Sequence, residues 1–285
     1  MEIVLNSKFF APLSIEQLGE KAIGLGYDGI DICIRPGHPI QIDNAAKLLP
    51  QAMRVWEKQG LVCPLATAAV DINQPTQEVG NLYAACAEVG IPRLKIGFWR
   101  YKTDDDYWRV VEAARNDLAG FVRFSQQYEV QTCYQIHSGS CIGSNCAGLM
   151  HLIKDFDPQY VGAYPDLGHL ALDGEDWDMG FSMIKDYISV VGIKDALYLR
   201  QPEGQTPSYI PCFVKVGEGC INWHHSLRKL LEHNFDGPLT VHTEYKFDES
   251  IIRQVGYADT SPPNLEQWAK EDVTYLRQIL SEMVN

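Results

Sequence analysis

The sequence predicts an α/β protein folded as a (β/α)8 TIM barrel, in which eight parallel strands are surrounded by helices. Short apolar segments alternate eight times with longer amphipathic segments, and no linker or low-complexity tract interrupts them. The length of 285 residues suits one such barrel, so residues 1–285 are expected to form a single domain. The main competitor is an open, doubly wound sheet, but its glycine-rich phosphate loop is missing at the first turn.

Each predicted element rests on its own pattern. The predicted strands are short apolar runs bounded by turn residues, at residues 3–7, 29–34, 62–66, 93–97, 131–136, 160–165, 189–194 and 239–243. The predicted helices carry apolar residues at helical spacing, at residues 14–26, 44–60, 76–90, 105–128, 148–156, 176–187, 222–234 and 264–283.

Composition excludes several functions. The formal net charge is −13, whereas a nucleic-acid-binding protein normally needs a basic face. The N-terminal sequence lacks the basic and apolar regions of a signal peptide, and no apolar run is long enough to span a membrane. Several of the eight cysteines lie in apolar strand-like runs, so we expect free thiols and a cytoplasmic protein rather than disulfides. Cys141 and Cys146 resemble half of a metal knuckle, but no second pair follows.

Polar residues cluster where the predicted strands end. In a (β/α)8 barrel these ends surround the active site, and buried charges are costly unless they are paired or bind a metal. The residues are Asp31, Arg35, His38, Trp99, Arg100, Tyr101, Gln135, His137, Asp166, His169, Lys194, Asp195, His242 and Glu244. His242 and Glu244 lie two apart in a strand and therefore share a face. This convergence predicts a functional site.

Some of these residues also have structural interpretations. Lys194 and Asp195 could form an ion pair that holds a loop, and Trp99 could pack at the rim instead of supporting a sugar ring. Four further histidines, namely His151, His224, His225 and His233, occur in predicted helices and are expected to be structural or exposed.

Five motifs in this order resemble the xylose-isomerase-like barrels, which include sugar-phosphate isomerases, ketose 3-epimerases and endonuclease IV. The motifs are GYDGIDI (26–32), DLGHL (166–170), IKDAL (193–197), VGEGCINW (216–223) and FDGPLTV (235–241). The resemblance implies a divalent metal held by Glu, Asp, His and Glu from strands five to eight, with the two glutamates moving a proton.

This sequence departs from that pattern at three of the four positions. The usual ligands fall on Gln135, Asp166, Gly192 and His242, so only the aspartate is kept. Two interpretations stay open: the metal is lost, or a shifted set of Gln135 or His137, Asp166, His242 and Glu244 holds it. We predict the shifted set, with Mn²⁺, Zn²⁺, Co²⁺, Fe²⁺ or Mg²⁺ as the metal. Asp166 and His242 should then face each other at the barrel mouth.

The resulting functional prediction is a sugar isomerase or epimerase that moves a proton next to a carbonyl, assisted by the metal. Glu244 is the predicted acid and base, with His137 and His169 as further catalytic residues. Arg35, His38, Trp99, Gln135 and Lys194 are the predicted substrate contacts. The alternatives are a lyase or hydratase of keto-sugars or keto-glycosides, and a sugar-binding barrel without catalysis. A small carbohydrate is the expected partner, with neither nucleic acid nor membrane, and a homo-oligomer is left open.

Overall fold

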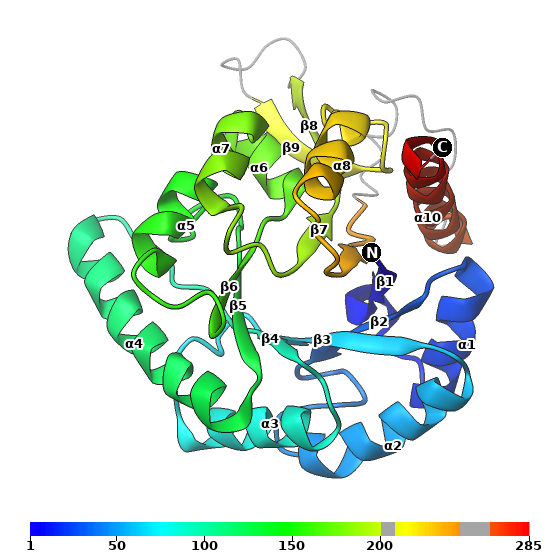
Figure 1. The fold of residues 1–285 in the computed structure, drawn as a ribbon, viewed down its shortest axis with the longest axis horizontal. Coiled ribbons are helices and arrows are strands. Elements are labelled where there is room, and N and C mark those ends of the chain that lie inside the picture. Colours follow the sequence, from blue (N-terminus) through cyan, green and yellow to red (C-terminus); the bar gives the residue numbers. More distant parts are fainter. Residues whose placement is uncertain (201–208, 246–262, 285) are drawn as a thin grey trace.

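The computed structural model describes residues 1–200, 209–245 and 263–284, and its described residues form a barrel of eight parallel strands (Figure 1). The predicted (β/α)8 fold is confirmed. The strands are β1 (Ile3–Asn6), β2 (Gly29–Ile34), β3 (Val62–Ala68), β4 (Arg93–Lys95), β5 (Gln131–Gln135), β6 (Val161–Tyr164), β7 (Val191–Ile193) and β10 (Leu239–Val241).

Strand order fixes which residues meet across the barrel. The hydrogen-bonded order is β6-β5-β4-β3-β2-β1-β10-β7. The two outer strands of this order, β6 and β7, meet through parallel bridges between Ala163 and Ile188 and between Asp166 and Gly192. In the resulting ring β4 lies opposite β10, since four steps separate them in either direction.

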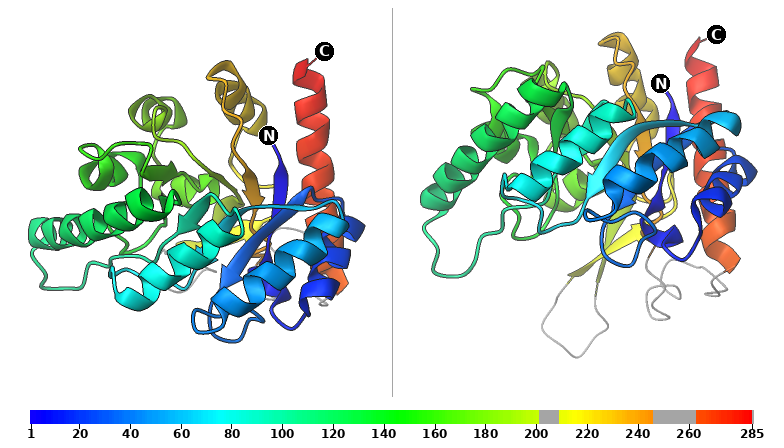
Figure 2. Two further views of the ribbon diagram at one scale, coloured as in Figure 1. Left: turned by 60° about the horizontal axis from the view of Figure 1, so that its bottom comes forward. Right: turned by 90° about the horizontal axis from the view of Figure 1, so that it is seen from below.

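A ring of helices covers the outside of the strands (Figures 1 and 2). The helices are η1 (Ser7–Phe10), α1 (Ile15–Leu25), α2 (Ala45–Lys58), α3 (Gln77–Glu88), α4 (Tyr107–Tyr128), α5 (Cys146–Ile153), α6 (Leu167–Asp173), α7 (Trp177–Ile184), α8 (Trp223–Glu232) and α10 (Pro263–Val284). Helix α1 shows why the predicted boundaries hold: Ser14 and Gln17 form a reciprocal capping box, and Gly26 ends the helix with a positive φ of 95°. Among the described residues, no helix is both long and apolar enough to cross a membrane.

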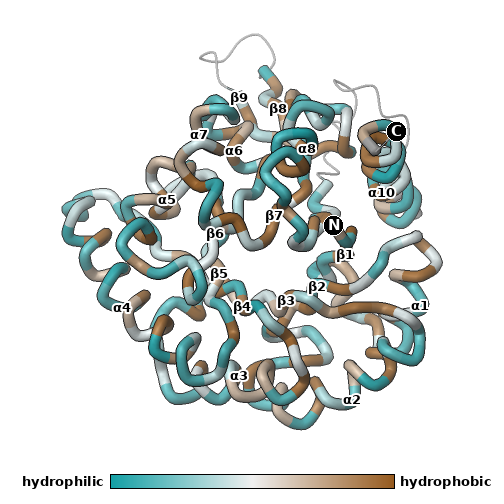
Figure 3. The backbone as a smooth tube through the Cα atoms, viewed as in Figure 1, coloured by the Kyte–Doolittle hydropathy of each residue, from teal (hydrophilic) through white to brown (hydrophobic). Residues whose placement is uncertain are grey.

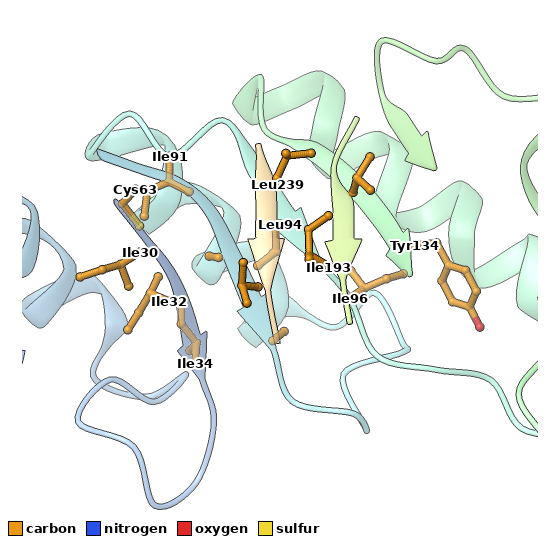
Figure 4. Packing of buried hydrophobic residues seen from close by; sticks show 14 of the residues in the cluster. Ile30, Ile32, Ile34, Cys63, Ile91, Leu94, Ile96, Tyr134, Ile193 and Leu239 are labelled. Carbon is orange, nitrogen blue, oxygen red and sulfur yellow. The ribbon is translucent and has the colours of Figure 1, made fainter. Parts of the chain in front are cut away.

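The alternation of side chains along each strand separates two buried layers. Along β2, Ile30, Ile32 and Ile34 belong to the large apolar cluster between strands and helices (Figure 4), whereas Asp31 and Cys33 alternate with them. A smaller cluster of Leu65, Cys133, Tyr164 and Val190 forms separately. Figure 3 shows that hydrophobic residues follow much of the strand ring. The polar residue Asp31 therefore lies on the face of β2 opposite the large apolar cluster.

The region after β7 differs from the prediction. The run 189–194 was expected as one strand, but the strand β7 covers only Val191–Ile193. After Lys194 the chain enters an antiparallel hairpin of β8 (Asp195–Arg200) and β9 (Tyr209–Val214), which projects from the barrel in Figure 2. The short helix α6 was not predicted either, because its N-cap, Asp166, follows β6 almost directly.

Candidate active site

The ends of the strands surround a small cavity of about 40 Å³. Its lining is mostly polar and charged, and it comes from β1, η1 and the ends of β2, β3, β4, β5 and β10, together with α6. The lining residues are Asn6, Lys8, Arg35, Thr67, Val70, Lys95, Phe98, Gln135, His137, His169, His242 and Glu244. This is the end of a (β/α)8 barrel at which active sites are found.

A lysine ammonium lies at the centre of the charged groups beside this cavity. Lys194 is 2% exposed, and its Nζ is 3.4 Å from Asp166 Oδ2 and 3.3 Å from Glu244 Oε2. His169 Nε2 lies 2.9 Å from the same Nζ. Since lysine Nζ can only donate, the imidazole nitrogen accepts this hydrogen bond. The Lys194 ammonium, which follows β7, therefore connects Asp166 and His169 after β6 with Glu244 after β10.

The electrostatics of this group favour the charged forms of Lys194 and both carboxylates. Burial by itself would raise the pKa of Asp166, but the Lys194 ammonium lowers it below the usual range. The pKa of Glu244 is likewise held well below its usual range, because Lys194 and His242 outweigh the effect of burial. Burial alone would lower the pKa of Lys194, yet Asp166 and Glu244 raise it above the ordinary value.

Glu244 and His242 emerge side by side after β10. Glu244 Oε1 accepts a hydrogen bond from Lys8 Nζ at 2.6 Å and lies 3.9 Å from His242 Nδ1. The other imidazole nitrogen of His242 is 2.7 Å from the hydroxyl of Tyr164, which fixes the ring. His242 Nδ1 is also 3.9 Å from Asp166 Oδ2, so the two residues predicted to face each other lie close together.

His137 and His169 form a second group on the β5–β6 side. Their ring centroids are 3.8 Å apart, and Ser138 Oγ lies 2.8 Å from His169 Nδ1. Burial lowers the pKa of His137 to about 4, and burial together with Lys194 lowers that of His169 well below its usual value. Both imidazoles are therefore neutral at neutral pH. They add no charge to the site, and both ring nitrogens of His169 are already engaged with Ser138 and Lys194.

A buried carboxylate stabilises the strands beneath the cavity. Asp31, which is fully buried, accepts hydrogen bonds from Asn6 Nδ2 and Thr67 Oγ1 at 2.6 Å each. Thr240 Oγ1 donates a third at 2.8 Å. These contacts join β1, β2, β3 and β10 at one point, so Asp31 positions strand ends instead of facing a ligand.

The structure brings most of the predicted site residues together. Gln135 Nε2 donates to Asp166 Oδ2 at 2.8 Å, and Arg35, Gln135, His137, His169, His242 and Glu244 all line the cavity. Within the described residues, Arg35 Nε is buried without a hydrogen-bond partner.

Three predicted substrate contacts do not line the cavity, namely Lys194, which lies beside it, Trp99 and His38. Trp99 is buried against Tyr134, with ring centroids 5.2 Å apart, and its Nε1 donates to Asp117 of α4 at 3.3 Å. The side chain thus packs under a helix and does not line the cavity. His38 is buried in the loop after β2 and is also absent from the lining.

The suggested Lys194–Asp195 ion pair is replaced by separate roles for the two residues. Asp195 Oδ2 accepts from Gly217 N at 2.9 Å and from Trp223 Nε1 at 2.8 Å. Successive residues point to opposite sides of an extended chain, so Lys194 faces the cavity group and Asp195 anchors the VGEGCINW segment.

Sequence reasoning missed Lys8 and Lys95, which both line the cavity. Lys8 lies in η1 and meets Glu244 across 236 residues of chain, a contact with no local signature. The position of Lys95 could have been inferred from the sequence. It stands between Leu94 and Ile96 in an apolar strand, so its side chain points to the face opposite theirs, toward the barrel interior.

The donor set fits an ammonium better than a divalent ion. Lys194 Nζ lies within 3.4 Å of both carboxylates, so a divalent ion between them would meet a fixed positive charge. The strand-seven ligand position is Gly192, where a Cβ atom would lie only 3.0 Å from Asp166 atoms. Within the described residues, no three His, Cys, Asp or Glu side chains converge as metal ligands would.

Comparisons with known proteins agree with this fold. The inosose dehydratase of Halalkalibacterium halodurans is 27% identical over 147 residues, which cover 49% of this chain and 47% of that protein. The chain thus spans about half the length of this curated relative. The crystal structure of apo 3-keto-D-glucoside 4-epimerase from E. coli superposes with a TM-score of 0.72 at 14% identity, covering 98% of this chain and 99% of the other.

A second solved structure resembles the fold of this chain to a similar degree. It is a xylose isomerase-like TIM barrel protein from Mycobacterium smegmatis in complex with magnesium, with a TM-score of 0.70, 17% identity and coverage of 100% of this chain and 98% of the other. The family model of the xylose isomerase-like TIM barrel matches residues 20–279. The chain belongs to the xylose isomerase-like TIM barrel family.

Proposed function

We propose that this chain is an enzyme that moves a proton at a carbon next to the carbonyl group of a keto-sugar. The family and the named activities of similar proteins, a dehydratase of inosose and a 4-epimerase of 3-keto-D-glucosides, support this reaction class. Both activities are consistent with a carbanion next to a carbonyl group. The substrate class is therefore a cyclic or open-chain keto-carbohydrate.

The observation that carries the proposal is the ammonium of Lys194 between Asp166, Glu244 and His169. Loss of a proton next to a carbonyl places negative charge on the carbonyl oxygen. A preorganised cation in a site with little water stabilises that charge at no cost of reorganisation. Lys194 can supply this cation because its pKa is raised and its position is fixed by three partners.

Glu244 is the proposed base. Its pKa is lowered, so the carboxylate is ionised at neutral pH and can accept a proton. Its side chain is 16% exposed and lines the cavity, whereas that of Asp166 is fully buried. Removal of Glu244 from the Lys8 and Lys194 contacts by an entering substrate would raise its proton affinity toward the value that catalysis needs.

The fate of the carbanion determines whether the reaction is an epimerisation or isomerisation, or a dehydration. Return of the proton to either face gives epimerisation, or isomerisation if the proton returns to the neighbouring carbon. Departure of a hydroxyl group from the β-carbon gives a dehydrated product instead. The neutral imidazole of His137, which lines the cavity, can orient such a hydroxyl, which makes the dehydratase the second candidate.

The competing proposal is the metal-assisted site predicted from the sequence, with Gln135, Asp166, His242 and Glu244 as ligands. Metal analysis of protein purified without chelator distinguishes the two sites. If a metal is present, Asp166→Ala should abolish its binding, whereas His151→Ala on helix α5 should leave metal content unchanged. The Lys194 site predicts less than one equivalent of Mn²⁺, Zn²⁺, Co²⁺ or Mg²⁺ and full activity after treatment with a chelator.

Deuterium exchange tests the function itself. The protein is incubated in D₂O with inososes, 3-keto-glucosides and ketohexoses, and NMR follows exchange at the carbon next to the carbonyl. We expect exchange with at least one of these, followed by an epimer or a dehydrated product, and loss of both with Lys194→Met. Binding of a keto-sugar without any exchange would instead identify a sugar-binding barrel without catalysis.

A further inference from the structure

Lys95 is a buried lysine for which the proposed reaction has no role. It stands in β4 between Leu94 and Ile96, which both belong to the apolar layer under the helices. Strand alternation therefore turns Lys95 toward the barrel interior, where it is 2% exposed and lines the cavity. A fully buried lysine is rare unless it is paired.

The Nζ atom of Lys95 lacks the partners that surround Lys194. It takes part in none of the hydrogen bonds or ion pairs found among the described residues, and its contact is the face of the Phe98 ring, 3.8 Å from the ring centroid. Phe98 lines the same cavity and also packs on His137 at 4.7 Å between ring centroids. The amine is thus held at the cavity wall with its nitrogen free to contact a ligand.

The surroundings of Lys95 favour the uncharged amine. Burial, followed by the nearby Arg35 guanidinium, lowers the pKa of Lys95 to about 7. An amine next to a second cation in a dry pocket is the usual arrangement of a nucleophilic lysine. The other titratable groups around it act more weakly and are Asp31, Cys33, Cys141 and His137.

We propose that Lys95 is a carbonyl-binding nucleophile that forms an imine with the keto or aldehyde group of a carbohydrate. The Nζ lone pair forms a bond to the carbonyl carbon. The nitrogen then gives up its two hydrogens, the carbon–oxygen bond breaks, and the oxygen departs with both hydrogens as one water molecule. One water molecule is released for each carbon–nitrogen double bond formed, and no oxidant or reductant takes part. The inference rests on the proposed function and deepens it. The protonated imine nitrogen takes up the negative charge that would otherwise develop on the carbonyl oxygen near Lys194, and it acidifies the neighbouring C–H more strongly than a ketone does.

Barrel geometry supports a joint action of Lys95 and Glu244. Strand β4 lies opposite β10 in the ring, so an imine on Lys95 would hold its carbohydrate between the amine and the Glu244 carboxylate. Both residues line the one cavity. The imine would act as the electron sink while Glu244 accepts the proton.

Reductive trapping tests this inference. The protein is incubated with glycolaldehyde and cyanoborohydride at pH 6, 7, 8 and 9, and peptide mass spectrometry measures labelling of each lysine. We expect Lys95 to be labelled at pH 7 at least about tenfold faster than Lys47, an exposed lysine of α2 with an ordinary environment. Lys194, which is charged and paired, should stay unlabelled.

Two variants check the cause of this reactivity. Arg35→Gln removes the neighbouring cation and should slow labelling of Lys95 at pH 7, while Lys95→Arg should remove the adduct and leave the rest of the lysine pattern intact. Labelling of Lys95 no faster than that of Lys47 would overturn the inference, as would full deuterium exchange by a folded Lys95→Met protein. Normal labelling of Lys95 without exchange in the unaltered protein would contradict the proposed function and still support the imine.

Discussion

At the scale of single residues, the charged group around Lys194 is stable only as a whole. Removing one partner from a buried ion pair typically costs about 3–5 kcal/mol, because the remaining charge is left without compensation. Asp166, which is fully buried, has both Gln135 and Lys194 as partners. Such a group is poor evidence for stability gained by the fold. The group therefore fits the role proposed for Lys194 better than a role in stability.

Replacing Glu244 with glutamine tests the proposed base. The change keeps the shape of the side chain and removes the group that accepts the proton, so exchange at the carbon next to the carbonyl should fall by about 10²-fold or more. Glu57→Gln, on the exposed side of α2, is the matched control and should leave exchange unchanged. If the Glu244→Gln protein exchanges at the rate of the parent, another residue is the base.

At the scale of elements, the sequence predicted the barrel well because each strand and helix has a local pattern. The eight predicted strands agree with the observed ones to within a few residues at each end. The hairpin of β8 and β9 escaped prediction because Lys194 and Asp195 lie inside one apolar run, and only the turn of the backbone there separates the barrel strand from the hairpin.

The candidate site could be predicted in outline only. Position at a strand end identified Asp166, Lys194, His242 and Glu244 as neighbours, since parallel strands end at one side of a barrel. It could not show that Lys194 lies between the carboxylates, because that depends on side-chain reach across three strands. Nor could it assign Trp99, whose direction is set by packing against α4.

Gly192 tests how closely β7 packs against the start of α6. A Cβ atom at residue 192 would lie 3.0 Å from the Cα, Cβ and Cγ atoms of Asp166, closer than nine in ten real Cβ contacts. We expect Gly192→Ala to lower the free energy of unfolding by about 1–3 kcal/mol and to reduce exchange by displacing Asp166. Chemical denaturation and the D₂O assay measure the two effects.

Gly24→Ala in helix α1 is the control for this prediction. No atom lies within 4 Å of a Cβ at residue 24, so alanine there should be neutral or stabilise by up to about 1 kcal/mol. If Gly192→Ala and Gly24→Ala changed the free energy of unfolding equally, crowding against Asp166 would not be the cause of the lost stability.

At the scale of the whole molecule, the lowered pKa values of site residues link stability to pH. His137 is protonated in the unfolded chain below about pH 6.5 but in the folded protein only below about 4, so the stability due to its neutral form is lost across that interval. Asp166 and Glu244 contribute stability above about pH 4 that is lost as pH falls through their lowered folded pKa values.

Acid denaturation should therefore occur in two stages. Urea midpoints should decrease between pH 6.5 and 4, and decrease again below pH 4. His38 and His169 also have lowered pKa values, so His137→Asn removes one of three histidine titrations. It should make the upper stage shallower while leaving the lower one in place. A His137→Asn protein with the unchanged profile between pH 6.5 and 4 would assign that loss to other groups.

Lys95 extends the same trend to the alkaline side, because its folded pKa is also lowered, and it connects stability with function. With an ordinary pKa of 10.5 in the unfolded chain and about 7 in the folded protein, Lys95 binds its proton more weakly when folded. The fold therefore loses stability as pH falls from about 10.5 to 7, by roughly 4–5 kcal/mol at 1.36 kcal/mol for each unit of pKa. Lys95→Met should raise the urea midpoint at pH 7, flatten its rise toward pH 10 and abolish imine formation, whereas Lys47→Met should change none of these. A protein destabilised at pH 7 by Lys95→Met would show that the buried amine serves packing instead of chemistry.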